Sequence, residues 1–384
     1  APQSKAVSGP KGDLRVAIVH DWLTNIGGAE RVVMSLLKAF PSADLYTSVY
    51  DPDKVPGLKT KRPVRTSFLQ HWPLAQRKHQ LYPAFRTLAF ESFDLSNYDL
   101  VISSSSAEAK GIITPVETKH LSYIYTPVRY YWSNYSEYLR DPGFGLLNPL
   151  IKLIMPPVTK LLMRWDYAAA QRPDALVGIS KVVQARIKKY YGRDSDVIYP
   201  PVDLSRFDVD KSTKGDYYLA VSRLVPYKRY DIAVEACTRL GKKLVVVGAG
   251  PELKRLKKMA GPTIEFKGFM NDSEITELYH GCKAFIFPGE EDFGITPLEA
   301  MACGKPVLAY AKGGVVETVV NGKTGVFFDR QSGASLMDAI GEFEAKKFDA
   351  AAVLNAANRA VAALVNLPKP AVAVVHGVAA GVGV

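Results

Sequence analysis

The sequence has few of the residues that build disulfides and metal centres. Only three cysteines occur among 384 residues, and Cys237, Cys282 and Cys303 show no metal-like spacing. An odd number of scattered cysteines favours a reduced, cytosolic setting over a disulfide framework. The six histidines are scattered as well, so the sequence predicts no zinc cluster. These absences argue against a small disulfide-rich protein and against a zinc enzyme.

A long uninterrupted apolar run is also missing. The most membrane-like stretch, residues 146–163, is broken by asparagine, lysine and proline, so we do not expect a spanning helix. Residues 1–12 are small and polar and lack the apolar segment of a signal peptide. We therefore predict that residues 1–12 form a disordered lead-in.

Acidic residues are outnumbered by basic ones. The 49 Lys and Arg residues exceed the 38 Asp and Glu residues and give a formal net charge of +11. Such an excess suits nucleic acid, phosphorylated metabolites or an acidic membrane surface, and charge alone does not choose among them. The apolar share of 47% is ordinary for a globular protein, and the length favours two domains.

Short apolar runs alternate with amphipathic helical patterns along the chain. The alternation starts at R-V-A-I-V-H (residues 15–20), breaks in the proline-punctuated, polar segment 199–216, and restarts at residue 217. This pattern predicts an α/β protein with two doubly wound, Rossmann-like domains that face a cleft. We place the domains at residues 13–205 and 206–349, followed by an atypical tail over residues 350–384.

Two patterns that resemble cofactor or metal motifs are weak. The run V-V-V-G-A-G-P-E-L carries Gly248 and Gly250 of a dinucleotide fingerprint, but Leu253 stands at the third glycine position. A tight strand-to-helix turn is the favoured interpretation. The D-x-D triplets at 194–196 and 208–210 fall in loops, where aspartate is ordinary turn chemistry.

Glycines and cations mark two loops that follow strands. Gly27 and Gly28 directly precede a helical pattern, and bare amides at a helix N-terminus suit a phosphate or a sugar hydroxyl. A turn that needs positive φ would select glycine equally well. Arg223 and Lys228 follow the first strand of the second domain, where they could grip a diphosphate. A solvated basic loop is the alternative there.

Two glutamates, Glu291 and Glu299, flank a glycine turn in G-E-E-D-F-G-I-T-P-L-E-A. A bound phosphate would repel them, so we expect them to point at hydroxyls of a sugar and a ribose. The alternative is a solvated loop in which Glu299 complements the helix dipole. Four residues between the glutamates offer backbone amides near the helix start: Phe293, Gly294, Ile295 and Thr296.

Taken together, the motifs of residues 13–349 resemble those of the family 4 retaining glycosyltransferases of the GT-B fold. Within them the chain is most similar to the mannosyltransferase group of O-antigen and polysaccharide assembly. The motifs that carry the resemblance are, in order, G-G-A-E-R-V, T-S-F-L-Q, Y-D-L-V-I-S-S-S, Y-T-P-V-R-Y-Y-W, Y-G-R-D, V-I-Y-P-P-V-D, R-L-V-P-Y-K-R and E-E-D-F-G-I-T-P-L-E-A-M-A.

The resemblance implies a nucleotide-sugar donor in the C-terminal domain and an acceptor on the N-terminal one. Arg223 and Lys228 would hold the donor diphosphate and stabilise the leaving nucleoside diphosphate, in place of a metal ion. Glu291 would bind hydroxyls of the transferred sugar and Glu299 the ribose diol. The other implied donor contacts are Gly27, Gly28, Gly268, Phe269, Phe293, Gly294, Ile295 and Thr296.

The chain departs from the family pattern at two places. Tyr125 stands where many relatives carry a histidine that contacts the donor sugar; tyrosine can donate a hydrogen bond but is no base at neutral pH. Arg129 beside it and Asp21 are the implied acceptor-side residues. Residues 366–384 resemble a short piece of the enoyl-CoA hydratase family, too short to carry that activity.

The resemblance implies transfer of a hexose, most of all mannose from GDP-mannose, to a glycan or lipid-linked acceptor, without a cofactor. The alternatives are a UDP-sugar donor, a GT-B epimerase or α-glucan phosphorylase, and a non-catalytic nucleotide-sugar-binding protein. Basic and aromatic residues interleave over residues 59–86. With residues 146–163 they predict a cytoplasmic protein that is peripheral on an anionic inner membrane face. A helical face packed on the sheet is the alternative, and no nucleic-acid motif is present.

Overall fold

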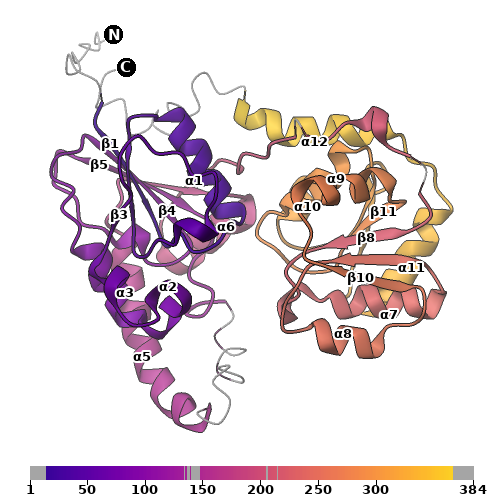
Figure 1. Ribbon diagram of the computed structural model, residues 1–384, viewed down its shortest axis with the longest axis horizontal. Helices are drawn as coiled ribbons and strands as arrows, with labels where there is room; N and C mark the ends of the chain where they lie inside the picture. Colours follow the sequence, from indigo (N-terminus) through magenta and orange to yellow (C-terminus); the bar gives the residue numbers. More distant parts are fainter. Residues whose placement is uncertain are drawn as a thin grey trace. The chain divides into compact units, whose positions relative to one another are not determined.

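The structure is a computed structural model that describes residues 14–133, 135, 139, 148–204, 206–213 and 215–365. The chain divides into two compact units at Pro201 and Val202, and the second unit ends at Val365 (Figure 1). The predicted lead-in over residues 1–12 and the hydratase-like segment 366–384 lie outside the described residues.

The N-terminal unit is built on a seven-stranded parallel sheet with the order β3-β2-β1-β4-β5-β6-β7. Every residue of the first strand is buried, as a strand covered on both faces requires. The strand order reverses beside β1, the position where doubly wound sheets bind ligands at their carboxyl edge. The strands are β1 (Val16–His20), β2 (Asp44–Thr47), β3 (Arg65–Thr66), β4 (Leu100–Ser105), β5 (Lys119–Ile124), β6 (Ala175–Gly178) and β7 (Asp196–Val197).

The longest helix of this unit is α5 (Asn148–Ala169), whose first half extends beyond the rest of the unit in Figure 1. Two aromatic residues of the basic segment 59–86, Trp72 and Tyr82, are partly buried and pack against a small core around Leu69, whereas Phe68 and Phe85 are exposed. The other helices are α1 (Gly28–Ala39), α2 (Ala75–Lys78), α3 (Pro83–Glu91) and α6 (Lys181–Tyr191), with short 3-10 turns η1 (Pro52–Lys54), η2 (Phe68–His71), η3 (His79–Leu81) and η4 (Ala109–Gly111).

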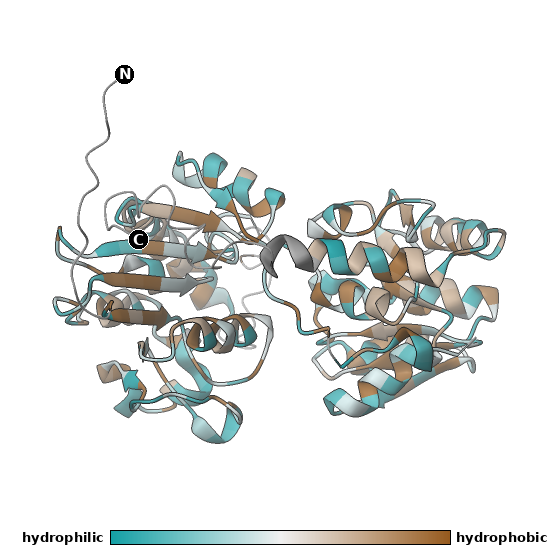
Figure 2. Ribbon diagram, turned by 90° about the horizontal axis from the view of Figure 1, so that it is seen from above, coloured by the Kyte–Doolittle hydropathy of each residue, from teal (hydrophilic) through white to brown (hydrophobic). Residues whose placement is uncertain are grey.

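The C-terminal unit repeats the topology with six parallel strands in the order β10-β9-β8-β11-β12-β13. Apart from the segment 264–268, which reads I-E-F-K-G, the strands are almost wholly apolar in sequence, and strands of this unit are brown in Figure 2. The point of reversal lies between β8 and β11. The strands are β8 (Tyr218–Val221), β9 (Leu244–Val247), β10 (Ile264–Gly268), β11 (Ala284–Phe287), β12 (Val307–Tyr310) and β13 (Gly325–Phe328).

Helices cover both faces of this second sheet. Figure 1 shows α7, α8 and α11 on one face and α9, α10 and α12 on the other. One apolar cluster joins the strands to α7 and α11, with Tyr218, Ile286 and Leu336 among its buried members. The helices are α7 (Tyr230–Leu240), α8 (Leu253–Met259), α9 (Asp272–Gly281), α10 (Ile295–Ala302), α11 (Gly333–Glu344) and α12 (Ala350–Val365), with 3-10 turns η6 (Val209–Lys211), η7 (Pro226–Lys228) and η8 (Gly314–Glu317).

The predicted class, an α/β protein with doubly wound parallel sheets, is confirmed. Sequence patterns did not mark β2, β3 or β13, and α10 begins at Ile295 instead of Pro297. The segment placed in an atypical tail starts with α12, which packs against α10 and buries Val353 and Ala357.

Candidate functional site

The loop after β8 presents the two cations singled out in the sequence. Arg223 lies on the surface directly after the strand, and Lys228 ends the 3-10 turn η7 in a half-buried position. Arg229 follows with φ of 54°, a left-handed conformation that is uncommon for a residue with a side chain. The Arg229 guanidinium makes a bidentate contact with Asp231, from Nε to Oδ1 at 3.1 Å and from Nη2 to Oδ2 at 3.2 Å.

The loop between β11 and α10 brings Glu291 to Lys228. Glu291 Oε1 lies 2.9 Å from Lys228 Nζ, and the two side chains are 21% and 17% exposed. Gly289 makes this approach possible, because a Cβ there would lie 3.0 Å from the Lys228 backbone. A cation and a carboxylate that are 63 positions apart therefore meet at the carboxyl edge of one sheet.

A third loop, which follows β12, contacts the Glu291 backbone. The Gly314 N–H donates to the Glu291 carbonyl oxygen at 2.8 Å, and a Cβ on Gly313 would lie 2.3 Å from that oxygen. These glycines follow β12, so the loops after β8, β11 and β12 all converge on Glu291. The carboxylate is held by packing of the main chain as well as by Lys228.

The turn that starts α10 offers backbone amides beside this pair. Gly294 adopts φ of 93°, which glycine permits at low cost, and it is the N-cap of α10. The N–H groups of a first helical turn have no intrahelical partner and favour anions or hydroxyl oxygens. Phe293 is buried beneath the turn, whereas Ile295 and Thr296 are half-buried.

Glu299 has partners that the sequence did not indicate. Its Oε1 accepts a hydrogen bond from Arg206 at 2.6 Å, and its Oε2 accepts one from the Tyr279 hydroxyl at 3.0 Å. Arg206 also forms an ion pair with Asp272 at 2.7 Å. A ribose diol would have to share the buried Glu299 carboxylate with Arg206 and Tyr279. The binding of the ribose by Glu299 therefore stays a prediction. No local motif marks Arg206, because it pairs with Glu299 across 93 positions.

The G-A-G run has a packing explanation. A Cβ on Gly248 would lie 1.8 Å from the Ser222 carbonyl oxygen, and one on Gly250 would lie 2.2 Å from that of Leu224. The glycines thus let the loop after β9 lie against the loop that carries Arg223. Gly248 also donates its N–H to the carbonyl of Gly268 at 2.7 Å.

Gly268, the last residue of β10, and Phe269 after it are two of the donor contacts that the resemblance implies. Gly268 has φ of 72°, and Phe269 beside it is 87% exposed. A phenyl ring left in solvent at the carboxyl edge of a sheet is available for contact with an apolar or aromatic ligand surface.

In the N-terminal unit, Gly27 and Gly28 lie where the sequence indicated. Gly27 is the N-cap of α1, its N–H donates to Glu30 Oε2 at 2.8 Å, and Gly28 is exposed. Tyr125 is buried: its hydroxyl donates to the Ala29 carbonyl at 3.1 Å. The Tyr125 hydroxyl is therefore engaged with the first turn of α1.

The two acceptor-side residues have different surroundings. Asp21 is fully buried, and its carboxylate accepts hydrogen bonds from the backbone N–H groups of Ser106, Ala107 and Ala109 at 2.6, 3.0 and 2.8 Å. This contact holds the loop after β4. Arg129 is half-buried. A direct contact of either residue with an acceptor remains a prediction.

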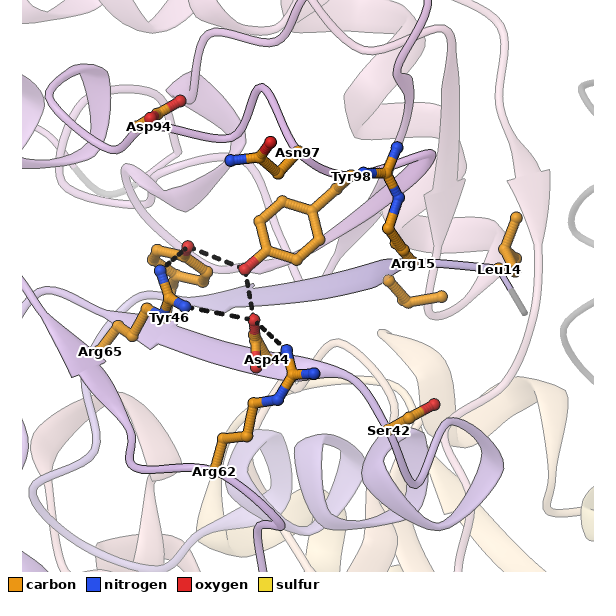
Figure 3. A pocket seen from close by; sticks show the side chains of 11 residues that line it. Leu14, Arg15, Ser42, Asp44, Tyr46, Arg62, Arg65, Asp94, Asn97 and Tyr98 are labelled. Carbon is orange, nitrogen blue, oxygen red and sulfur yellow. Dashed lines mark hydrogen bonds and ion pairs between the residues drawn. The ribbon is translucent and has the colours of Figure 1, made fainter. Parts of the chain in front are cut away.

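A pocket of about 510 Å³ lies at the opposite edge of the N-terminal sheet (Figure 3). Its lining includes Asp44 at the start of β2 and Tyr98 just before β4. Asp44 is already bound by Arg62 at 3.0 Å, Arg65 at 3.5 Å and the Tyr98 hydroxyl at 2.5 Å, as the dashed lines show. Doubly wound sheets bind ligands at the carboxyl ends of their strands, so this pocket is not the candidate site.

Comparison with known proteins agrees with the geometry. The family described as "Glycosyltransferase Family 4" matches residues 26–206, and the one described as "Glycosyl transferases group 1" matches residues 202–360. Together these matches cover both units and extend into α12.

Two curated relatives are mannosyltransferases by name. The GDP-mannose-dependent alpha-(1-6)-phosphatidylinositol monomannoside mannosyltransferase of Mycobacterium tuberculosis (strain ATCC 25618 / H37Rv) is 29% identical over 53% of this chain and 60% of its own length. That match spans less than two thirds of the relative. Alpha-1,3/1,6-mannosyltransferase ALG2 of Saccharomyces cerevisiae is 26% identical over 79% of this chain and 71% of its own.

Solved structures share the architecture. Anabaena Alr3699/HepE in complex with UDP and glucose superimposes with a TM-score of 0.64 at 20% identity, over 95% of this chain and 98% of that one. At such identity the likeness concerns the fold. Taken with the family matches, it leads to one assignment: the chain belongs to the family 4 glycosyltransferases, and its two doubly wound domains are those of the GT-B fold.

Proposed function

We propose that the chain is a retaining, metal-independent hexosyltransferase that moves mannose from GDP-mannose to a glycan or a lipid-linked acceptor. The observation that carries the proposal is the 2.9 Å pair of Lys228 and Glu291 at the carboxyl edge of the C-terminal sheet. It brings a cation for a diphosphate and a carboxylate for sugar hydroxyls to one place. The names of the mannosyltransferase relatives support the donor.

Arg223 and Lys228 would act on the leaving group. A nucleoside diphosphate gains negative charge as the glycosidic bond breaks, and fixed cations stabilise that charge without reorganisation. Arg223 supplies a planar fork for two phosphate oxygens, and Lys228 supplies a point charge. Among the described residues, no group of three or more His, Cys, Asp or Glu side chains is placed to hold a metal ion.

Glu291 would orient the sugar. Its carboxylate accepts hydrogen bonds only, which suits sugar hydroxyls. In same-face attack, the acceptor hydroxyl forms its bond to the anomeric carbon as the bond to the diphosphate breaks. The hydroxyl proton passes to the leaving phosphate oxygen, so the protein needs to position the reactants rather than supply a base.

A screen of nucleotide sugars tests the donor. We expect GDP-mannose to raise the melting temperature more than UDP-glucose or UDP-N-acetylglucosamine at equal concentration, because only a ligand that binds the folded state stabilises it. Release of GDP in the presence of a mannoside acceptor, with an α-linked product by NMR, would establish transfer with retention. A larger shift with UDP-glucose would replace the donor with a UDP sugar, in line with the UDP complexes of a structurally similar protein.

We also propose that the N-terminal unit binds the cytoplasmic face of an anionic membrane, where a lipid-linked acceptor would lie. Helix α5 has one face buried in the unit, through Thr159, Leu162 and Asp166. A second apolar stripe is exposed on the same helix, at Leu153, Ile154, Val158 and Leu161.

The charges around this second stripe suit anionic lipid. Residues 142–165 contain no Asp or Glu, and neither do residues 54–90, which add Arg77 and Lys78 on α2. Lys152, Lys160 and Arg164 are exposed on α5. Basic residues that flank exposed apolar side chains are typical of an interfacial helix. None of the described helices combines the length and the apolar character that a membrane span requires.

Vesicle flotation tests the membrane contact. We expect the protein to float with vesicles that contain phosphatidylglycerol and not with pure phosphatidylcholine, and Leu153→Glu with Leu161→Glu to abolish flotation. The matched control is Val116→Glu, which changes another exposed apolar side chain of the same unit, outside both acid-free segments. Equal binding of both variants, or no binding of the wild type to either vesicle, would defeat the proposal.

A further inference from the structure

A closed chain of buried polar contacts starts and ends in the first turn of α1. It joins four segments that are far apart in the sequence: α1, the end of β1, the end of β4 and the residue after β5. The contacts are Gly27 N to Glu30 Oε2 at 2.8 Å, Glu30 Oε1 to His20 Nε2 at 3.8 Å, His20 Nδ1 to Ser104 O and Oγ at 3.0 and 3.1 Å, Ser104 Oγ to Tyr125 OH at 2.8 Å, and Tyr125 OH to Ala29 O at 3.1 Å.

The acceptors in this chain determine where the protons lie. The Ala29 carbonyl can only accept, so the Tyr125 hydroxyl donates to it and in turn accepts from Ser104 Oγ. The Ser104 carbonyl also only accepts, so His20 Nδ1 carries a proton. The opposite ring nitrogen of His20 faces a carboxylate, which favours a proton there as well. His20 thus directs a proton to each side, through Nε2 toward Glu30 and through Nδ1 toward Ser104, and the hydrogen bonds continue from Ser104 through Tyr125 to the Ala29 carbonyl.

All four side chains are buried, which makes the arrangement costly to break. A buried carboxylate requires a partner, and Glu30 has both the His20 ring and the Gly27 N–H. Burial lowers the pKa of His20, but the hydrogen bond and charge of Glu30, together with Asp21, outweigh it and raise the pKa overall. The Glu30 and Asp21 carboxylates therefore favour the charged form of the His20 ring.

The chain has a specific consequence for the glycine turn. Gly27 has no side chain with which to cap α1, and Glu30 holds its N–H from inside the unit instead. Tyr125 fixes Ala29, the residue after Gly28, through a hydrogen bond to the Ala29 carbonyl. The exposed Gly28 lies between these two fixed points. Its backbone orientation is set by side chains from β1, β4 and the segment after β5.

We propose that Glu30, His20, Ser104 and Tyr125 are positioning residues that hold the Gly27–Gly28 backbone for contact with the donor diphosphate. This inference rests on the proposed function and on the donor contact that the family resemblance implies for Gly27 and Gly28. Tyr125 acts through the turn: its hydroxyl is directed into the unit toward Ala29 and Ser104 and does not serve as a sugar contact. The position is thereby used for support, not for direct catalysis.

Removal of one hydroxyl tests the inference. Tyr125→Phe keeps the ring and opens the chain, and we expect the KM for GDP-mannose to rise roughly tenfold while kcat changes less than about threefold. The matched control is Tyr123→Phe, two residues earlier within β5, which loses a partly buried hydrogen bond of 2.8 Å to the Ile198 carbonyl that is not one of these contacts. The control should lose stability without any change in KM.

Coupling between links gives a second measurement. Ser104→Ala opens the same chain at the neighbouring bond, so the double variant with Tyr125→Phe should raise KM little more than either single change. Multiplied effects on KM would show that the two groups act separately. A fall in kcat at unchanged KM in Tyr125→Phe would give the hydroxyl a direct role in the reaction and overturn the inference.

Hydrogen exchange separates this inference from the proposed function. Amides in residues 26–29 should exchange faster in Tyr125→Phe than in the wild type, and no faster in Tyr123→Phe, whether or not a donor is known. If no nucleotide sugar binds the wild type but the exchange result holds, the proposed function fails and the positioning of the turn stands. Unchanged exchange in Tyr125→Phe would refute the positioning itself.

Discussion

The two units share a topology and differ in where they keep their charges. In the N-terminal unit, Arg86 pairs with Glu108 at 2.9 Å and Lys110 with Asp166 at 2.5 Å, and all four side chains are at most 3% exposed. In the C-terminal unit, the apolar cluster fills the centre, and the pair of Lys228 with Glu291 remains partly exposed.

Burial therefore distinguishes ion pairs that support the fold from ion pairs whose charges are available to a ligand. A fully desolvated pair is worth little over an apolar replacement, but removal of one partner strands a buried charge. A partly exposed pair can exchange its partner for a substrate at low cost to the fold. We therefore expect substitutions in the first unit to act on stability and those at Lys228 or Glu291 to act on catalysis.

The largest effect is expected for Asp166→Ala. It leaves Lys110 buried without its carboxylate and removes the acceptor of the Trp132 indole and the Tyr191 hydroxyl, at 2.7 and 2.8 Å. We expect the free energy of unfolding of the N-terminal unit to fall by about 3–5 kcal/mol. Urea titration followed by tryptophan fluorescence measures this.

Fluorescence isolates the first unit because all four tryptophans lie in it: Trp22, Trp72, Trp132 and Trp165. The control is Asp194→Ala, which removes an exposed partner of Lys188 in the same unit. It should leave the urea midpoint unchanged. A similar loss in both variants would show that burial does not distinguish these pairs.

The second prediction concerns the pair in the other unit. Lys228→Ala and Glu291→Ala should each lower turnover at least a hundredfold, about 2.7 kcal/mol of lost transition-state stabilisation, with little change in melting temperature. Lys242→Ala serves as the control, since it breaks a partly exposed pair with Glu344 beside the amino end of β9. Near-normal activity of either site variant would remove the pair from the mechanism.

A smaller expected effect is the loss of the stability that Glu344 contributes to the C-terminal unit as the pH falls. Burial alone would raise the pKa of Glu344, but hydrogen bonds from Lys242, Lys283 and Tyr218 lower it to about 2. A lowered folded-state pKa contributes stability above the ordinary value near 4.5 and loses it as the pH falls toward 2. Glu344→Gln should therefore be less stable than the wild type at pH 7, with a difference that shrinks by pH 2 in circular dichroism.

The smallest expected effect is a loss of stability of the N-terminal unit as the pH rises, whereas the C-terminal unit loses stability as the pH falls. His20 has a raised pKa, so its contribution to stability is complete below its ordinary value of 6.5 and is lost as the pH rises through the folded-state value. In His20→Asn the tryptophan-detected stability should vary less between pH 6 and 9 than in the wild type. An identical pH dependence would mean that another group carries the titration.

The sequence placed most strands because each is a short, continuous apolar run. It missed β2, which reads D-L-Y-T and is buried although it begins with a charge. The charge is tolerated because Arg62, Arg65 and Tyr98 surround Asp44, and these partners lie 18 to 54 positions away. No local pattern announces such a partner, so the strand could not be recognised from its own residues.

The candidate site shows the same limit. Glycine turns, helix starts and the loop cations could be located from local patterns, and the resemblance placed Lys228 and Glu291 at one donor site with different roles. The partners of Glu299 and the inward direction of the Tyr125 hydroxyl could not be inferred. Both depend on side chains from other elements, Arg206 and Tyr279 in one case and Ser104 in the other.

Local sequence patterns were enough to predict the alternation of strand and helix, the two-unit organisation and the glycine turns at the carboxyl edges. These features follow from hydrophobic periodicity and backbone sterics, which act over a few neighbouring residues. Which charges are paired in the interior and which remain accessible became visible in the folded protein alone. That choice depends on strand order and packing, because a buried charge is stable only where distant segments bring it a partner.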